Sequence, residues 1–427
     1  LATDVALTVS AGTATAAQLN TINGITTGLV TATAVTAISG TAAALNTLIG
    51  NEGNSGDKVD LAGDFTVTVS AGSAAASHLI TINAETTALV TATAVTTITG
   101  TAADIATLMG DEGSSGNSVD LASDVATTVS AGSASAAHLN TINSGTTGLV
   151  TATAVTTVTG TAVQINTLAG NEGSSGDKVD LAADVALTVS AGTTTAAQLN
   201  TINGITTGLV TATAVTAISG TATQLDTLVG NEGTSGDKVD LATDVALTVS
   251  AGTATAAQLN AIEDKTTANV TATAVTAISG TAAQLNTLIG AEGTGTNQIN
   301  LAANVALTVT AGTTTATILN ALNSGTTGLV TATAVTGVTG LAADLNTLIG
   351  NEGSSGNAVD LASNVALTVS AGTTTATILN ALNDGTTGLV TATAVTGVTG
   401  VATDLNTLVG NEGSSGDKVD LAADVAL

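Results

Sequence analysis

Seven glutamates stand at the same place in a repeated glycine-rich loop, and aspartates follow them at fixed distances. Glu52 is followed by Asp57, Asp60 and Asp64. Carboxylates that converge with the backbone carbonyls of such a loop supply the hard oxygen ligands that Ca²⁺ binds, about six to eight of them per ion. The sequence therefore predicts structural calcium sites, with these candidate ligands: Glu52, Asp57, Asp60, Asp64, Glu112, Asp120, Glu172, Asp177, Asp180, Glu232, Asp237, Asp240, Glu292, Glu352, Asp360, Glu412, Asp417 and Asp420.

A second interpretation of the same loops is an exposed polar turn in which each Asp caps the local backbone. The spacing is neither that of an EF-hand nor that of the glycine-rich nonapeptide of calcium β-rolls. Asn also replaces Asp at Asn117, Asn297, Asn357 and Asn300. The sequence leaves both interpretations open.

Threonine forms a second regular series, always within the phrase Val-Thr-Ala-Thr-Ala-Val-Thr. Thr31 and Thr33 are the first pair, and the pair recurs in every repeat. Residues two apart lie on one face of a strand, so stacked strands would tile these side chains into a lattice like that of ice-binding solenoids. Threonine is also an ordinary strand residue, so the pattern has a purely structural explanation.

Other polar positions favour structural roles. Asn20, Asn140, Asn200, Asn260, Asn320 and Asn380 follow a buried Leu, as expected of an asparagine ladder that satisfies backbone groups at bends. His78 and His138 share a position that elsewhere holds Gln or Ile, which indicates a surface site. No serine triad, phosphate loop, paired acid and base or His/Cys cluster is present in the pattern, so we expect no enzyme.

The element that must position all these residues is a 60-residue repeat without insertions or deletions. Leu1, Leu61 and Leu121 open the same phrase, as do their later equivalents. The repeats are 1–60, 61–120, 121–180, 181–240, 241–300, 301–360 and 361–420, and 421–427 begins an eighth. Constant length is typical of a stack in which neighbours complete each other's core. We expect the chain to be a segment of a longer array.

Within one repeat the pattern predicts strand, helix, strand, helix and loop. Val5, Leu7 and Val9 alternate with small polar residues up to Gly12. A short helix capped by Thr13 or Thr15 follows and ends at Gly24. Residues 30–38 form a second strand, residues 42–49 a second helix capped by Thr41, and residues 51–60 a turn-rich loop. We therefore predict an α/β solenoid with parallel strands and right-handed crossovers, of one or two coils per repeat.

Composition excludes several functions. The chain of 427 residues has a net charge of −27, with five Lys and no Arg, which argues against binding to nucleic acid or an anionic membrane. No Cys, Trp or Tyr is present and Phe65 is the only Phe, so disulfides and aromatic hot spots are excluded. Polar residues interrupt every apolar run before it reaches the ~20 residues of a membrane span.

Phrases such as Val35-Thr-Ala-Ile-Ser-Gly-Thr-Ala-Ala-Ala-Leu-Asn-Thr-Leu48 resemble the Thr/Ala/Gly-rich repeats of giant bacterial cell-surface proteins of the cyanobacterial type. The resemblance implies a secreted or surface-anchored array in calcium-containing water. Our first hypothesis is an extracellular structural protein, a calcium-stabilised rod or filament whose partners are copies of itself. The alternatives are a ligand- or ice-binding solenoid with a Thr lattice and an enzyme on a solenoid scaffold.

Overall fold

The computed structural model describes residues 3–427, which form an α/β solenoid with two coils in each repeat. Each coil contains one short helix. The helices of the first coils are α1 (Ala16–Asn23), α3 (Ala76–Ala84), α5 (Ala136–Gly145), α7 (Ala196–Asn203), α9 (Ala256–Glu263), α11 (Ala316–Ser324) and α13 (Ala376–Asp384). Those of the second coils are α2 (Ala42–Gly50), α4 (Ala102–Gly110), α6 (Ala162–Gly170), α8 (Ala222–Gly230), α10 (Ala282–Gly290), α12 (Ala342–Gly350) and α14 (Ala402–Gly410).

Five short strands accompany the two helices of a repeat. Two of the five strands precede the first helix. These are β1 (Leu7–Thr8), β6 (Thr66–Val69), β11 (Ala126–Val129), β16 (Ala186–Val189), β21 (Ala246–Val249), β26 (Ala306–Val309) and β31 (Ala366–Val369), and then β2 (Gly12–Thr15), β7 (Gly72–Ala75), β12 (Gly132–Ser135), β17 (Gly192–Thr195), β22 (Gly252–Thr255), β27 (Gly312–Thr315) and β32 (Gly372–Thr375).

Two more strands lie between the helices. These are β3 (Val30–Ala32), β8 (Val90–Ala92), β13 (Val150–Ala152), β18 (Val210–Ala212), β23 (Val270–Ala272), β28 (Val330–Ala332) and β33 (Val390–Ala392), and then β4 (Val35–Gly40), β9 (Val95–Gly100), β14 (Val155–Gly160), β19 (Val215–Gly220), β24 (Val275–Gly280), β29 (Val335–Gly340) and β34 (Val395–Thr399). The last strand follows the second helix: β5 (Val59–Leu61), β10 (Val119–Leu121), β15 (Val179–Leu181), β20 (Val239–Leu241), β25 (Ile299–Leu301), β30 (Val359–Leu361) and β35 (Val419–Leu421).

The strands pair in parallel with strands of the preceding and following coils, which confirms the predicted α/β solenoid. A typical sheet has the order β12-β14-β16-β18-β20, with one strand from each of five consecutive coils. The first coil of a repeat contributes strands to three different sheets. In the coil that opens the fourth repeat, for example, β15, β16 and β17 each belong to a different sheet. The sheets therefore cross the stack obliquely.

The obliqueness comes from a slip in register. Leu187 pairs with Val210, and Val210 pairs with Val239. After two coils the sheet has thus reached Val239, whereas the residue that occupies the place of Leu187 in the next repeat is Leu247. Adjacent strands lie about 4.8 Å apart, but packed helices need about 8–10 Å. The slip lets each coil advance further than one strand spacing, so strands and helices can follow the same stack.

The core is a set of inward rows that run across each sheet. One row consists of Ala134, Val158, Leu187, Val210 and Val239, all of them buried. The outward row of the same sheet is Ser135, Thr159, Thr188, Thr211 and Asp240, all of them at least partly exposed. Small β-branched side chains thus fill a thin core, with hydroxyls on the outside.

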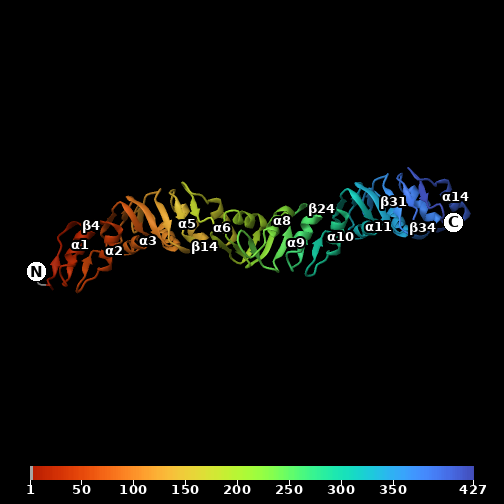
Figure 1. The fold of residues 1–427 in the computed structure, drawn as a ribbon. Coiled ribbons are helices and arrows are strands. Elements are labelled where there is room, and N and C mark those ends of the chain that lie inside the picture. The colour runs from red at the N-terminus through yellow and green to blue at the C-terminus, as the bar shows by residue number, and fades with distance from the viewer. Residues whose placement is uncertain (1–2) are drawn as a thin grey trace. The chain divides into compact units, whose positions relative to one another are not determined.

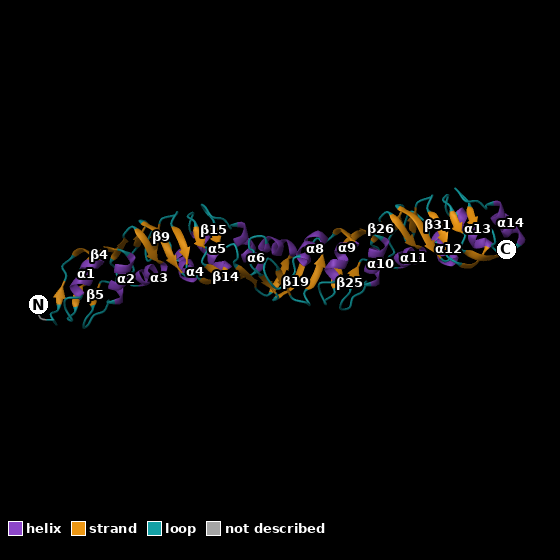
Figure 2. Cartoon of the chain, viewed as in Figure 1, coloured by secondary structure: helices purple, strands orange, loops and turns teal. Residues whose placement is uncertain are grey.

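Capping and neighbour packing hold helices that are too short to be stable alone. The Thr41 hydroxyl accepts a hydrogen bond from the Ala44 N–H, which confirms Thr41 as the predicted cap of the second helix. Thr15, one of the two residues predicted to cap the first helix, forms a capping box with Gln18. Successive helices pack side by side, α1 on α2 and α2 on α3 (Figure 1). The helices form one layer and the strands another (Figure 2).

The predicted asparagine ladder is confirmed as a structural device. Asn20 Nδ2 donates to the Ala44 carbonyl at 2.9 Å, and Asn140 and Asn320 make the equivalent bond to the carbonyls of Gln164 and Asp344. Each such asparagine ties the first helix of its repeat to the start of the second helix.

Three boundaries differ from the predictions. The chain from Gly12 to Thr15 is a strand rather than the start of the helix, because it pairs with β4. The predicted strand over residues 30–38 is two strands, separated by a turn at Thr33 and Ala34. The end of the predicted loop is strand β5, in which Val59 and Leu61 are buried and Asp60 pairs with Thr31.

Contacts divide the chain into two compact units. The first comprises residues up to Gly192 together with Gln198–Ala214 and Glu232–Leu241, and the second comprises the rest. Both units contain the same coils, sheets and helix layer. No helix in the described part of the chain has the length and apolar character needed to cross a bilayer.

Candidate functional site

The predicted calcium ligands of one loop lie on different parts of the coil. The Glu52 backbone pairs with Val59 at the start of the loop, and Asp57 lies in the exposed bend. Asp60 alternates with the buried side chains of β5, and Asp64 lies in the turn before β6. Among residues 3–427 no three His, Cys, Asp or Glu side chains are grouped so that they could hold a metal ion. Calcium binding by one loop stays a prediction.

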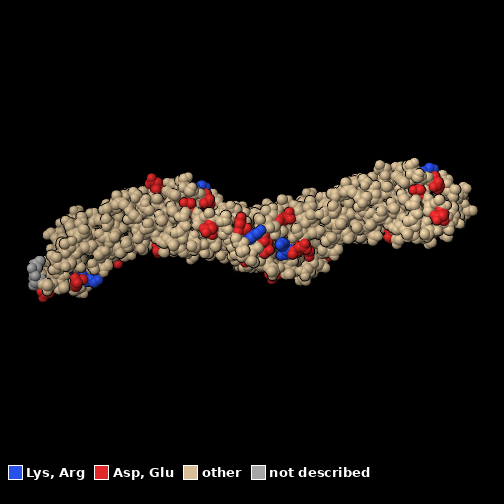
Figure 3. Space-filling view, in the orientation of Figure 1, with Lys and Arg blue, Asp and Glu red and all other residues tan. Residues whose placement is uncertain are grey.

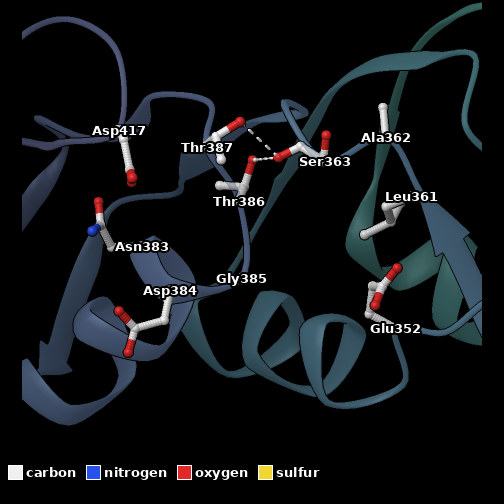
Figure 4. A pocket seen from close by; sticks show the side chains of 10 residues that line it. All are labelled: Glu352, Leu361, Ala362, Ser363, Asn383, Asp384, Gly385, Thr386, Thr387 and Asp417. Atoms are coloured by element: carbon white, nitrogen blue, oxygen red, sulfur yellow. Dashed lines mark hydrogen bonds between the residues drawn. The ribbon is translucent and has the colours of Figure 1, made fainter.

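In the structure, the loops of successive repeats border a common cleft instead. In the first unit, a cleft of about 370 Å³ is lined by Glu112 from one loop and Asp177 from the next. Between them lie residues 121–123, the end of α5 from Asn143 to Gly145, and the two residues after it, Thr146 and Thr147. The second unit has the equivalent cleft of about 400 Å³, between Glu352 and Asp417 (Figure 4). We call these two the inter-loop clefts.

Two adjacent threonines, which the sequence analysis did not single out, build the floor of the cleft. The Thr386 hydroxyl donates to the Val365 carbonyl at 2.6 Å and accepts from the Gly388 N–H at 2.9 Å. The Thr387 hydroxyl donates to the Ser363 carbonyl at 3.1 Å. Thr386 is only 4% exposed, so its hydroxyl fastens the end of one coil to the turn of the coil before it. The Thr-Thr pair at this place in every repeat was the sequence signal that could have identified these two residues.

Lysine has a local partner in the same loops. Lys58 Nζ donates to the Gly50 carbonyl at 3.2 Å, and Lys178 and Lys418 make the equivalent bond to the end of the preceding helix. Lys58, Lys178, Lys238 and Lys418 lie in these loops, each directly after an Asp, whereas the fifth lysine, Lys265, follows α9. Where the loop has Asn in place of that Asp, the next residue is Ser118, Gln298 or Ala358. Figure 3 shows the charged residues in small groups on an otherwise uncharged surface; some groups combine Lys with Asp or Glu, and others contain only Asp or Glu.

The paired threonines do not form the predicted lattice. Thr151 lies on β13, beside Thr128 on one side and Asp180 on the other, but Thr153 lies in the turn between β13 and β14. The two side chains therefore do not share one strand face. The hydroxyl row that includes Thr151 ends at Asp180, and the row of the next sheet crosses the same coil at Thr188. The slip of the sheets thus divides the hydroxyls into short, staggered rows.

The cleft carries more acceptors than donors. The Oδ1 atoms of Asn143 and Asn383 are buried and have no hydrogen-bond donor within residues 3–427. At the equivalent place in another repeat, Asn203 Nδ2 donates to Asp237 Oδ1 at 3.3 Å, while Asn203 Oδ1 has no donor in the described chain. An amide oxygen without a donor is therefore a recurring feature of this position, whichever way the amide is turned. Such a buried acceptor costs stability unless something satisfies it.

Comparison with protein-family models, curated proteins and solved structures found no match to this chain.

One carboxylate of this region has a shifted pKa. Glu263 stands where most repeats have Asn, at the end of α9. Burial, and then the charge of Asp264, raise the pKa of Glu263 above its ordinary value of 4.5. A raised pKa means that the folded chain binds this proton more tightly than the unfolded chain. The resulting stabilisation is complete below the unfolded pKa and is lost as pH rises through the folded pKa.

We therefore expect Glu263→Gln to stabilise the protein at pH 7 by a modest amount, below about 1 kcal/mol because Glu263 is partly exposed. At pH 4 the variant and the parent chain should unfold at the same temperature. Thermal unfolding followed by circular dichroism at both pH values tests this. An equal gain at pH 4 and pH 7 would show that the effect is not electrostatic.

Proposed function

We propose that this chain is an extracellular structural repeat protein, in which equivalent two-coil repeats stack into a rod or filament stabilised by calcium. The observation that supports the proposal is the repetition of the same inter-coil bonds. The Thr146 hydroxyl donates to the Val125 carbonyl at 2.6 Å, and Thr266 and Thr326 make the equivalent bonds to Val245 and Val305 at 2.7 and 2.6 Å. Bonds that recur in each repeat favour a function that increases with length.

Uniformity also distinguishes this proposal from an enzyme on a solenoid scaffold. An active site needs one repeat that departs from the rest by gaining acids, bases or nucleophiles. The largest departure is Glu263-Asp264-Lys265 in the fifth repeat, and it occupies the same end of the helix as its counterparts, with Asp264 and Lys265 exposed. A ligand- or ice-binding role for the threonine rows stays an alternative prediction, but their short, staggered rows do not favour it.

Electron microscopy of chains with five, seven and nine repeats tests the structural proposal. We expect particles whose contour length increases by the same increment for every two repeats added, because each repeat contacts its neighbours in the same way. Particles that grow in width, or a length that does not change, would contradict it. The location outside the cell rests on the resemblance of the repeats, and protease treatment of intact producing cells tests it: removal of the array supports it, and full protection contradicts it.

A further inference from the structure

We propose that the inter-loop cleft of the second unit binds a hydrated Ca²⁺ ion between Asn383, Asp384 and Asp417. This inference specifies the calcium of the proposed structural array, and so rests on that part of the proposed function. It replaces the set of ligands within one loop by a set that joins the end of a helix in one coil to the loop of the next. Asn383 and Asp384 were not among the predicted ligands.

Asn383 places a buried amide oxygen without a donor at the cleft. Its side chain is 8% exposed, lines the cleft, and has an Oδ1 atom to which no group of the described residues donates. In Figure 4 the amide oxygen of Asn383 and the carboxylate of Asp417 point toward one another. In this orientation the two acceptor oxygens repel unless a donor or a cation lies between them. In the opposite orientation, which the equivalent Asn203 adopts, the amide oxygen still has no donor among the described residues.

The side chains that line the cleft are negatively charged. Glu352, Asp384 and Asp417 line it, and the described residues of its lining include no Lys, Arg or His. The nearest lysine in sequence, Lys418, donates from Nζ to the Gly410 carbonyl at 3.3 Å. The hydroxyls of the two floor threonines already donate to backbone carbonyls. The carboxyl end of α13 adds the negative end of a helix dipole.

Two repeats carry the same kinds of oxygen ligand at exchanged positions. The fifth repeat has Glu263 in place of Asn383 and Asp264 in place of Asp384, and its loop has Asn297 in place of Asp417. Both sets contain two carboxylates and one amide, with the amide moved from the helix end to the loop. The second and sixth repeats hold Asn at both positions, so the number of carboxylates is kept between the fifth and seventh repeats but not in every repeat.

The chemistry of these groups indicates which cation binds. All are hard oxygen ligands, which suits Ca²⁺ rather than a transition metal. A cleft of about 400 Å³ leaves room for several waters on the ion, since one water occupies about 30 Å³. An open, hydrated site with two carboxylates belongs to the weak class of calcium sites, with Kd near 10⁻⁴–10⁻³ M as an order of magnitude.

Three substitutions test the site in the full chain. Two of them introduce the residue that another repeat has at the equivalent position, and the third introduces a carboxylate where another repeat has one. Asp417→Asn reproduces Asn357, and Asp384→Ser reproduces Ser324. Asn383→Asp adds a carboxylate where the fifth repeat has Glu263. Asp404→Gln, which reproduces Gln164, is the matched control, because Asp404 lies on α14, outside the cleft, and is not one of the predicted ligands.

Calorimetric titration with CaCl₂, with circular dichroism to verify folding, gives the readout. We expect Asp417→Asn to remove about one calcium ion per chain, Asp384→Ser to raise Kd of that ion several-fold, and Asn383→Asp to lower Kd several-fold. Asp404→Gln should bind as the parent does. Calcium uptake unchanged in both Asp417→Asn and Asn383→Asp would overturn this site but leave calcium binding elsewhere. No uptake by the parent chain would overturn the calcium stabilisation altogether, and neither result would affect the structural proposal.

Discussion

Inserting one alanine between Thr157 and Val158 is expected to disrupt the fold around the third repeat. Both residues lie on β14, which pairs with β12 on one side and β16 on the other. The insertion exchanges the inward and outward faces of the residues after it, so Val158 leaves its place between Ala134 and Leu187. Removing buried apolar side chains from the contacts of β14 with β12 and β16 should lower the free energy of unfolding by about 3–5 kcal/mol.

The matched control is one alanine inserted between Ser174 and Ser175, in the exposed bend of the same repeat. Lengthening a flexible loop by a single residue costs well below about 1 kcal/mol. Hydrogen exchange should show lost protection over β14, β16 and α6 for the first insertion and nearly parental protection for the second. Equal losses from the two insertions would mean that the assigned register does not determine stability.

The class of the fold could be predicted because its strongest signals are local. Leu45, Leu48 and Ile49 repeat at helical spacing behind the cap Thr41, and all three are buried in α2. The asparagine bond at Asn20 could be anticipated for the same reason: an Asn that follows a buried Leu on a helix has backbone carbonyls within reach.

The strands were harder to predict because their partners lie far away in the sequence. Gly12–Thr15 contains only small residues, and it is a strand because it pairs with β4, which lies beyond helix α1 and strand β3 in the chain. Val59–Leu61 follows a run of Gly, Ser and Asp, and only its two buried side chains mark it as strand β5. Pairing over such distances is decided by the stack, not by the propensity of the segment.

The site was only half predicted for the same reason. The carboxylate of Asp417 was identified from its loop, but its neighbour Asn383 lies at the end of α13, and two strands and helix α14 separate the two residues in the chain. Spacing along the sequence says nothing about the distance between two coils, so a set of ligands shared between them could not be assembled from it. The repeated Asn before the Thr-Thr pair, replaced only by Glu263, was the available signal.

Removing one whole repeat should leave the array nearly as stable as before. Deleting residues 121–180 joins Asp120 to Leu181, which re-creates the Asp-Leu junction of the parent chain. The first coil of the fourth repeat then follows the second coil of the second repeat, as it does in every native junction. The melting temperature should stay within a few degrees of the parent value.

Deleting half as many residues should be far more damaging. Removing residues 121–150 joins Asp120 to Thr151 and brings two second coils together. The two kinds of step along a sheet are not interchangeable: Thr127 pairs with Val150, whereas Val150 pairs with Val179, so the second step takes up more of the chain than the first. The two second coils cannot satisfy both offsets, so strand pairing and helix packing compete at the junction.

We therefore expect the half-repeat deletion to cost several kcal/mol and to produce a separate low-temperature transition in calorimetry. The physical reason is that a repeat array broken at one interface no longer unfolds as one cooperative stack. The whole-repeat deletion is the control, since it shortens the chain further but leaves every interface of a native kind. A single transition at the parent temperature after the half-repeat deletion would show that the coils are equivalent and that the period of two coils has no structural role.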